Sequence, residues 1–293
     1  MKPFLSIFIF TLLAIASVSA QDYEIKLQYP HKANQRFRYS VVAQESSQST
    51  MSAQQKVVQN QKEEQRVEMD SVMTVLEVDD KGRPTKESHV IVNFTRQKGT
   101  AKEPVLTAGS RVTASRKDGK PVFEVGDKPA GEDVSKALAL AISVGEGGAT
   151  DDEIFGTTER KKVADSWSIN EELAKKDFAT KPIAQAFEIQ KISGKTTLQN
   201  VTKEDDHDVL HLSSTMTATL SPAAGGKFSS GTMTLQITAG GKFPANGEGA
   251  QEETATMNMT VRMSGKTDPN GPAMQMTATA KRTATHKTKP MKP

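Results

Sequence analysis

Two histidines set four residues apart are the first residues whose types and spacing could do chemistry. His207 and His211 lie in "HDVLH", and zinc binds such a pair when the segment is a helix and glutamate follows the first histidine. Here aspartate follows, and the neighbouring residues alternate as in a strand, which separates the histidines by ~13 Å, too far for one ion. The acidic run at 204–208 is typical of a solvated turn, because it lacks the pattern of a dedicated calcium loop. We therefore predict no metal site.

Ser166, in "ADSW", is the residue to consider as a nucleophile. No Gly-x-Ser-x-Gly turn surrounds it, and no histidine stands in a recognisable partner motif. Trp167 is instead expected to be a buried anchor, with Asp165 turning the chain. The glycine-rich "GEGG" at 145–148 lacks the Lys-Ser/Thr pair that grips phosphate. The sequence thus predicts no enzyme and no cofactor.

The first twenty residues have the pattern of a cleaved secretory signal. Lys2 supplies the positive start, residues 4–18 are nearly all apolar, and Val18 and Ala20 are the small residues before a cut. The apolar run is too short to cross a bilayer, and no later stretch is apolar enough. We predict a signal peptide at 1–20, export to the periplasm or the outside, and no transmembrane segment after cleavage.

Charge and cysteine content narrow the function classes. The chain has 38 basic and 35 acidic side chains, a formal net charge of +3, which argues against a nucleic-acid partner. It has no cysteine, which excludes disulfides, thiolate metal sites and lipid attachment to a cysteine at the signal cut. With one Trp and three Tyr, the core must be built mainly from aliphatic residues and Met, and we expect it to be thin, as on one curved sheet.

Alternating apolar and polar residues dominate the rest of the chain and set the fold class. Turn residues such as Asp80, Gly82, the pair Asp118-Gly119 and "DPNG" (268–271) separate the alternating runs, so strand–turn–strand recurs. This pattern predicts a mainly β protein with a large, curved antiparallel sheet, either open or a half-barrel. The strand signals lie at 23–29, 36–42, 67–78, 83–94, 111–125, 195–220, 232–237, 253–265 and 273–286.

The period changes between 130 and 180. Apolar residues at helical spacing predict a helix at 132–144, and Asn170 is suited to cap a second, shorter helix, with 145–153 as a loop between them. We expect this helical insertion to pack on the concave face of the sheet within a single domain at 21–288. Residues 289–293 are predicted to be a disordered tail.

The stretch 43–65 is rich in Gln and Ser, and it is compatible with a long hairpin, a helix or a flexible loop. The period of two that continues from Val67 to Val75 favours extended strands.

Methionines gather on one parity of the C-terminal strands. In "ETATMNMTVRMSG" (253–265), Ala255, Met257, Met259, Val261 and Met263 share one face, and polar residues occupy the other. Methionine fills irregular apolar space and adapts to varied partners. The face is therefore either ordinary core or the lining of a greasy cavity for an acyl chain or lipoprotein tail. The candidate residues are Met216, Met233, Met257, Met259, Met263, Met274 and Met276.

Three segments carry a resemblance to known proteins. "KKVADSWSIN" after a helix, then "GKTTLQNVTKEDDHDVLHL", then "TMTLQI" and the last Thr/Met hairpin resemble bacterial envelope proteins of a family of unknown function. The layout is also remotely similar to the periplasmic lipoprotein carriers, which are curved, unclosed barrels with helices inside. The resemblance implies a lipid or lipoprotein partner and no catalytic residue.

We therefore expect a non-enzymatic secreted or periplasmic protein that binds a lipid, an acyl chain or a lipoprotein in an apolar cavity. The alternative is a structural or protein-interaction module of the cell envelope without a small-molecule ligand. Such a module would assemble through its long sheet edges.

Overall fold

The computed structural model describes residues 21–54, 56–117, 120–145, 148–180, 184, 186–204, 206–223, 230–247, 249–266 and 273–291. The predicted signal peptide 1–20 and the predicted turns at 118–119 and 268–271 lie outside these residues. Within them the fold is one antiparallel sheet of thirteen strands, which confirms the predicted fold class.

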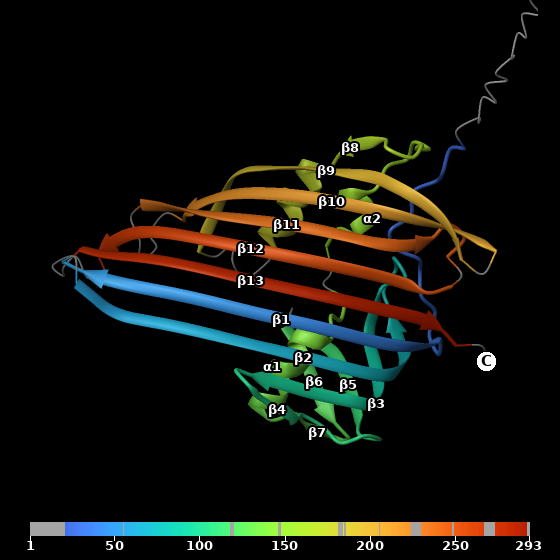
Figure 1. Ribbon diagram of the computed structural model, residues 1–293, viewed down its shortest axis with the longest axis horizontal. Coiled ribbons are helices and arrows are strands. Elements are labelled where there is room, and N and C mark those ends of the chain that lie inside the picture. Colours follow the sequence, from blue (N-terminus) through green and yellow to red (C-terminus); the bar gives the residue numbers. More distant parts are fainter. Residues whose placement is uncertain are drawn as a thin grey trace, which may run out of the picture.

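The sheet is open. Its order is β7-β6-β5-β3-β2-β1-β13-β12-β11-β10-β9-β8, with β4 paired to β3, and within the described chain the end strands β7 and β8 do not pair with each other. The long strands lie side by side, and the short strands β4 to β7 gather at one edge (Figure 1). The strands are β1 (Arg36–Ala53), β2 (Lys56–Val78), β3 (Pro84–Lys98), β4 (Ala101–Pro104), β5 (Arg111–Lys117), β6 (Lys120–Val125), β7 (Lys128–Pro129), β8 (Ser166–Ser168), β9 (Phe187–Glu204), β10 (His207–Pro222), β11 (Ser230–Pro244), β12 (Gln251–Lys266) and β13 (Ala273–Pro290).

The Gln- and Ser-rich stretch 43–65 forms the outer part of the β1–β2 hairpin, as the extended interpretation predicted. Its strands pair in antiparallel register from Ala43 opposite Val67 to Ala53 opposite Lys56. Few of these side chains are buried, so the backbone ladder rather than a packed core holds this part of the hairpin.

The three helices of the described chain pack against one face of the sheet, which is called the inner face. α1 (Glu132–Ala141) and α3 (Glu171–Ala179) confirm the two predicted helices. The Asn170 side chain accepts a hydrogen bond from Leu173 N at 3.1 Å, as an N-cap does. The predicted loop 145–153 was wrong in part, because α2 (Asp151–Phe155) begins there behind a Thr150–Glu153 capping box.

The predicted strand at 23–29 is also wrong. Tyr23 makes one isolated bridge to Lys161, and further along, the backbone amides bond to a side chain instead of a strand. The Asp152 carboxylate of α2 accepts from Leu27 N at 2.6 Å and from Gln28 N at 3.2 Å. The alternation of this segment reflects the burial of Ile25 and Leu27 against the sheet rather than strand pairing.

The inner face packs in three clusters. The first lies under α1, where Leu138 joins side chains of the sheet such as Met69 and Phe94. The second lies beside α2 and α3, and the third lies under the N-terminal segment that carries Ile25 and Leu27. One sheet with a partial helical cover thus gives separate small cores instead of one deep core.

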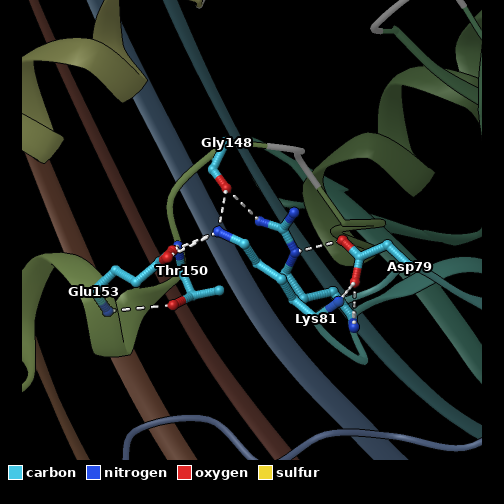
Figure 2. Close-up of polar contacts among 6 residues, drawn as sticks. Asp79, Lys81, Gly148, Thr150 and Glu153 are labelled. Atoms are coloured by element: carbon cyan, nitrogen blue, oxygen red, sulfur yellow. Dashed lines mark hydrogen bonds and ion pairs between the residues drawn. The ribbon is translucent and has the colours of Figure 1, made fainter.

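A cluster of hydrogen bonds and an ion pair joins α2 to the turn between β2 and β3 (Figure 2). Lys81 Nζ lies 2.7 Å from the Glu153 carboxylate, and Arg83 Nη1 donates to Gly148 O at 3.0 Å. Asp79 holds the turn itself, because its carboxylate accepts from Lys81 N and from Arg83 N and Nε. These polar contacts hold α2 in position over the inner face.

β13 runs to Pro290, so the strand enters the first residues of the predicted tail 289–293. Met291 N still donates to Arg36 O at 2.9 Å. No helix in the described part of the chain combines the length and the apolar character needed to cross a membrane.

Candidate functional site

Six of the seven candidate methionines come together in the second cluster. Met233 and Met263 are buried there, with 1% and 8% of their surfaces exposed. The others, Met216, Met257, Met259 and Met276, are only partly buried against the same cluster. Met274 lies on the same parity of β13 but outside this cluster.

Strand register explains the grouping. Met263 of β12 stands opposite Met276 of β13, and Met276 stands opposite Met51 of β1, so three methionines form a line across the inner face. Directly opposite side chains in an antiparallel pair contact each other. Met51 was not expected from the sequence, because only the strand order brings β1 beside β13.

An incompletely covered strip lies at the border of the second cluster, on the side that faces the first cluster. On β13, Ala284 belongs to the first cluster and Ala278 packs against the second, with Ala280 and Arg282 between them. The strip is named here the Met–Ala strip, and none of its side chains is fully buried. Its members are Met257 and Met259 of β12, Ala278 and Ala280 of β13, and Ser47 and Ser49 of β1, which are neighbours by register.

Arg282 stands at the α1 end of the strip. Its Nη2 donates to the carbonyl oxygens of Ala139 and Leu140, at 3.2 and 3.3 Å, in the last turn of α1. Helix C-termini leave such carbonyls without partners inside the helix. The guanidinium therefore joins the helical cover to the sheet at the edge of the strip.

Burial favours the neutral forms of two ionisable groups on the same face, Glu253 and His286. Burial, with a contribution from Asp151, raises the pKa of Glu253 to about 7. Burial, with a contribution from Arg282, lowers the pKa of His286 to about 4. Neither group was singled out from the sequence, although both have the parity of the neighbouring methionines and alanines, which would have predicted that they face inward.

Tyr39 fixes the tautomer of His286. The Tyr39 hydroxyl lies 2.6 Å from Ala141 O and 2.8 Å from His286 Nδ1. The carbonyl can only accept, so the hydroxyl proton goes to Ala141 O, and His286 Nδ1–H donates to the Tyr39 oxygen. This arrangement satisfies a further carbonyl at the end of α1.

A hydroxyl, an imidazole and a carboxylate also stand in sequence inside the first cluster. Ser71 Oγ lies 3.0 Å from His89 Nδ1, and His89 Nε2 lies 3.1 Å from Glu87 Oε2. That order of groups is typical of an activated serine. However, Ser71, His89 and Glu87 are 4%, 0% and 6% exposed, so a substrate cannot reach the hydroxyl, and the three groups satisfy one another's polar atoms in the core.

The structure places the residues first considered for chemistry in separate polar contacts. His207 Nδ1 lies 3.0 Å from Asn246 Nδ2, and His211 Nε2 lies 2.9 Å from Thr202 Oγ1. Ser166 lies on the short strand β8. The described residues contain no cluster of three or more His, Asp or Glu side chains placed to hold a metal ion.

Trp167 is half-buried and anchors the edge of the sheet. Its indole Nε1 donates to Phe155 O at 2.8 Å, at the end of α2. Asp165 Oδ2 accepts from Lys162 N at 2.8 Å and turns the chain, as expected.

The outer face carries a shallow polar cavity of about 390 Å³. It lies over Gly240, and its walls include His211, Lys242, Glu252 and Thr254. Lys242 is paired with Glu204 at 3.2 Å. This cavity is separate from the Met–Ala strip, which faces the opposite side of the sheet.

Comparison with known proteins does not identify a family. No family model and no curated protein matches the sequence. Among solved structures, an outer membrane channel from Pseudomonas putida F1 aligns over 89% of this chain and 99% of its own, with 9% identity and a TM-score of 0.18. Pseudomonas aeruginosa OpdQ aligns over 88% and 98%, with 8% identity and a TM-score of 0.20. Scores this low do not establish a shared fold.

Proposed function

We propose that this protein binds the acyl chain of a lipid or lipoprotein along the Met–Ala strip of its inner face. The observation that carries the proposal is the gradient of burial among its methionines. Met233, in one cluster with Ile154 of α2 and Ala174 of α3, is 1% exposed, whereas Met257 and Met259 on the next strand are partly exposed. The apolar face continues past the edge of its own cover.

An acyl chain suits this surface for two reasons. Burial of apolar surface contributes roughly 25 cal/mol per Å², and an extended chain can follow the line of a strand. Methionine side chains adjust to a flexible guest, and the Ala and Ser side chains of β13 and β1 stand lower than those of Met257 and Met259. The strip can therefore receive a chain without moving the sheet.

The remaining features fit a carrier or binding protein of the envelope. The signal-like residues 1–20 support export to the periplasm or the outside. The layout of the sequence resembles that of the periplasmic lipoprotein carriers, which would bind a lipid-modified partner in the same way.

Native mass spectrometry of the full chain after gentle extraction tests the proposal. We expect an adduct with the mass of a lipid or acyl chain on the wild-type protein. The adduct should be lost in Met259→Asp and retained in Thr260→Asp, because residue 260 faces the other side of the sheet and is exposed. A bare chain in all three proteins would contradict the proposal.

A second candidate is a protein-interaction module. Near its tip, the β1–β2 hairpin exposes the apolar side chains of Val57 and Val58, at 63% and 57%. Defined oligomers of the bare chain in the same spectra, dissolved by Val57→Asp, would favour this function over acyl-chain binding.

A further inference from the structure

We infer that Arg282 binds the head group of the ligand and that the ligand is a single-chain anionic amphiphile with a carboxylate, a fatty acid. This inference rests on the proposed function and adds to it the charge of the ligand and its direction on the sheet. The carboxylate lies at Arg282, beside the end of α1, and the acyl chain runs from there along the Met–Ala strip.

Arg282 lies on the same face of the sheet as the Met–Ala strip. It follows Met276, Ala278 and Ala280 at intervals of two along β13, so all four side chains share the inner face. It stands opposite Met257 of β12. The distance from Arg282 to Met276 along the strand is roughly 20 Å at the usual rise, which is long enough for an extended fatty acyl chain.

The guanidinium of Arg282 keeps donors that can bind an anion. Both bonds to α1 use Nη2, which leaves the Nε and Nη1 donors without a protein acceptor among the described residues. No carboxylate of the described residues lies within 4.0 Å of this guanidinium. A partly buried guanidinium without a counter-ion, at the end of an apolar strip, complements an anion attached to an apolar chain.

The neighbouring groups limit the charge of that anion. Glu45 of β1 stands opposite Arg282 in register, but its carboxylate accepts from Gln65 Nε2 at 3.3 Å instead. His286, two residues further along β13, has a pKa lowered by burial to about 4 and is neutral near pH 7. Arg282 is thus a cation at the end of the strip, and one guanidinium beside a glutamate matches one carboxylate better than a dianionic phosphate.

Fluorescence titration with a matched pair of ligands tests the inference. The full chain is titrated with cis-parinaric acid and with its uncharged methyl ester, which share one acyl chain. We expect the wild-type protein to bind the acid more tightly. Arg282→Met should weaken binding of the acid about tenfold and leave the ester within about twofold, since a charge-assisted hydrogen bond is lost only for the acid.

Three further variants control for folding and for general charge. Lys281→Met removes the same charge from the adjacent residue, which is exposed on the outer face, and should leave both ligands unchanged. Arg282→Lys keeps the charge and should retain part of the preference for the acid. Glu45→Gln removes the repelling carboxylate and should tighten binding of the acid alone, without weakening the α1 contacts.

The outcomes separate this inference from the proposed function. If both ligands bind equally and neither Arg282→Met nor Glu45→Gln changes their ratio, the head-group site is wrong while acyl-chain binding stands. If neither ligand binds to the wild-type protein, the proposed function fails, and this inference fails with it. Equal losses in Lys281→Met and Arg282→Met would also overturn it, because they would indicate a general effect of charge.

Discussion

Glu253 and His286 stand directly opposite each other on β12 and β13, yet they do not form an ion pair. Burial raises the pKa of Glu253 to about 7 and lowers the pKa of His286 to about 4. Between these values both groups are neutral in the folded protein. Their contributions to the pH dependence of stability have opposite signs and largely cancel in the wild-type chain.

Replacing Glu253 should remove its contribution to the pH dependence of stability. The carboxyl has a folded pKa above its ordinary value of 4.5, so the folded state holds the proton more tightly, and stability is lost as pH rises from 4.5 to 7. Glu253→Gln should therefore gain stability over wild type, from near zero at pH 4 to about 1–3 kcal/mol at pH 8. Urea denaturation at both pH values measures the difference.

The neighbouring glutamate gives the matched control. Glu252 points to the outer face and pairs with Lys287 at 3.1 Å. Glu252→Gln should not show the rising gain, and an equal gain in both variants would contradict the inward placement of Glu253.

Replacing His286 should change the pH dependence of stability in the opposite direction. The folded pKa lies below the ordinary value of 6.5, so the unfolded chain binds the proton more tightly, and stability is lost as pH falls from 6.5 to 4. His286→Gln keeps a donor for Tyr39 and should gain on wild type as pH falls through that window. An NMR titration of the His286 ring should give a midpoint near 4, and a midpoint near 6.5 would show that the ring is not buried.

Introducing aspartate along the inner face should reproduce the gradient of burial. Met233→Asp places a carboxylate where 1% of the native side chain is exposed and should cost several kcal/mol. Met259→Asp should cost about 1–2 kcal/mol, because water reaches part of this site. Thr260→Asp should stay within about 0.5 kcal/mol. Chemical denaturation midpoints rank the three, and equal effects at 259 and 260 would show that the period-two assignment of β12 is wrong.

Removing the cap of α2 should loosen the cover of the inner face. Thr150 Oγ1 accepts from Glu153 N at 3.2 Å, and the Glu153 carboxylate accepts from Thr150 N at 2.7 Å. Thr150→Ala should cost about 1 kcal/mol. It should also speed hydrogen exchange at Leu27, whose amide bonds to Asp152 of the same helix. Thr158→Ala, at an exposed position after α2, should change neither, and equal exchange in both variants would rule out α2 as the element that holds Leu27.

The sequence predicts the sheet well, because its strands are long and their alternation is regular. A period of two over the fifteen residues of β11 or the sixteen of β12 cannot be mistaken for a helix. It also predicts which methionines face inward. In the segment at 23–29 a period of two does not mean a strand, since Ile25 and Leu27 alternate with polar residues although the segment bonds to Asp152 and not to a strand.

The candidate site could be predicted only in part. Parity identifies the methionine face, but the open strip depends on where α1 and α3 stop covering the sheet, and no local pattern encodes that. Met51 joins the site because β1 pairs with β13, and Arg282 lies at its border with α1 because it bonds to Ala139 and Leu140. Both are contacts between distant parts of the chain. Strand order of this kind arises from tertiary packing and cannot be obtained from spacing in one sequence.

The pairing of β1 with β13 also determines when the protein can finish folding. The first long strand and the last lie together in the middle of the sheet, from Phe37 opposite Pro290 to Ala53 opposite Met274. The β1–β2 hairpin joins neighbouring parts of the chain and can form early. The other edge of β1 stays unpaired until β13 pairs with it. Contacts so distant in sequence make folding slow, and an unpaired strand edge attracts other chains. Until β13 is in place, the chain therefore exposes an edge at the centre of its sheet, and residues 274–290 are needed to cover it.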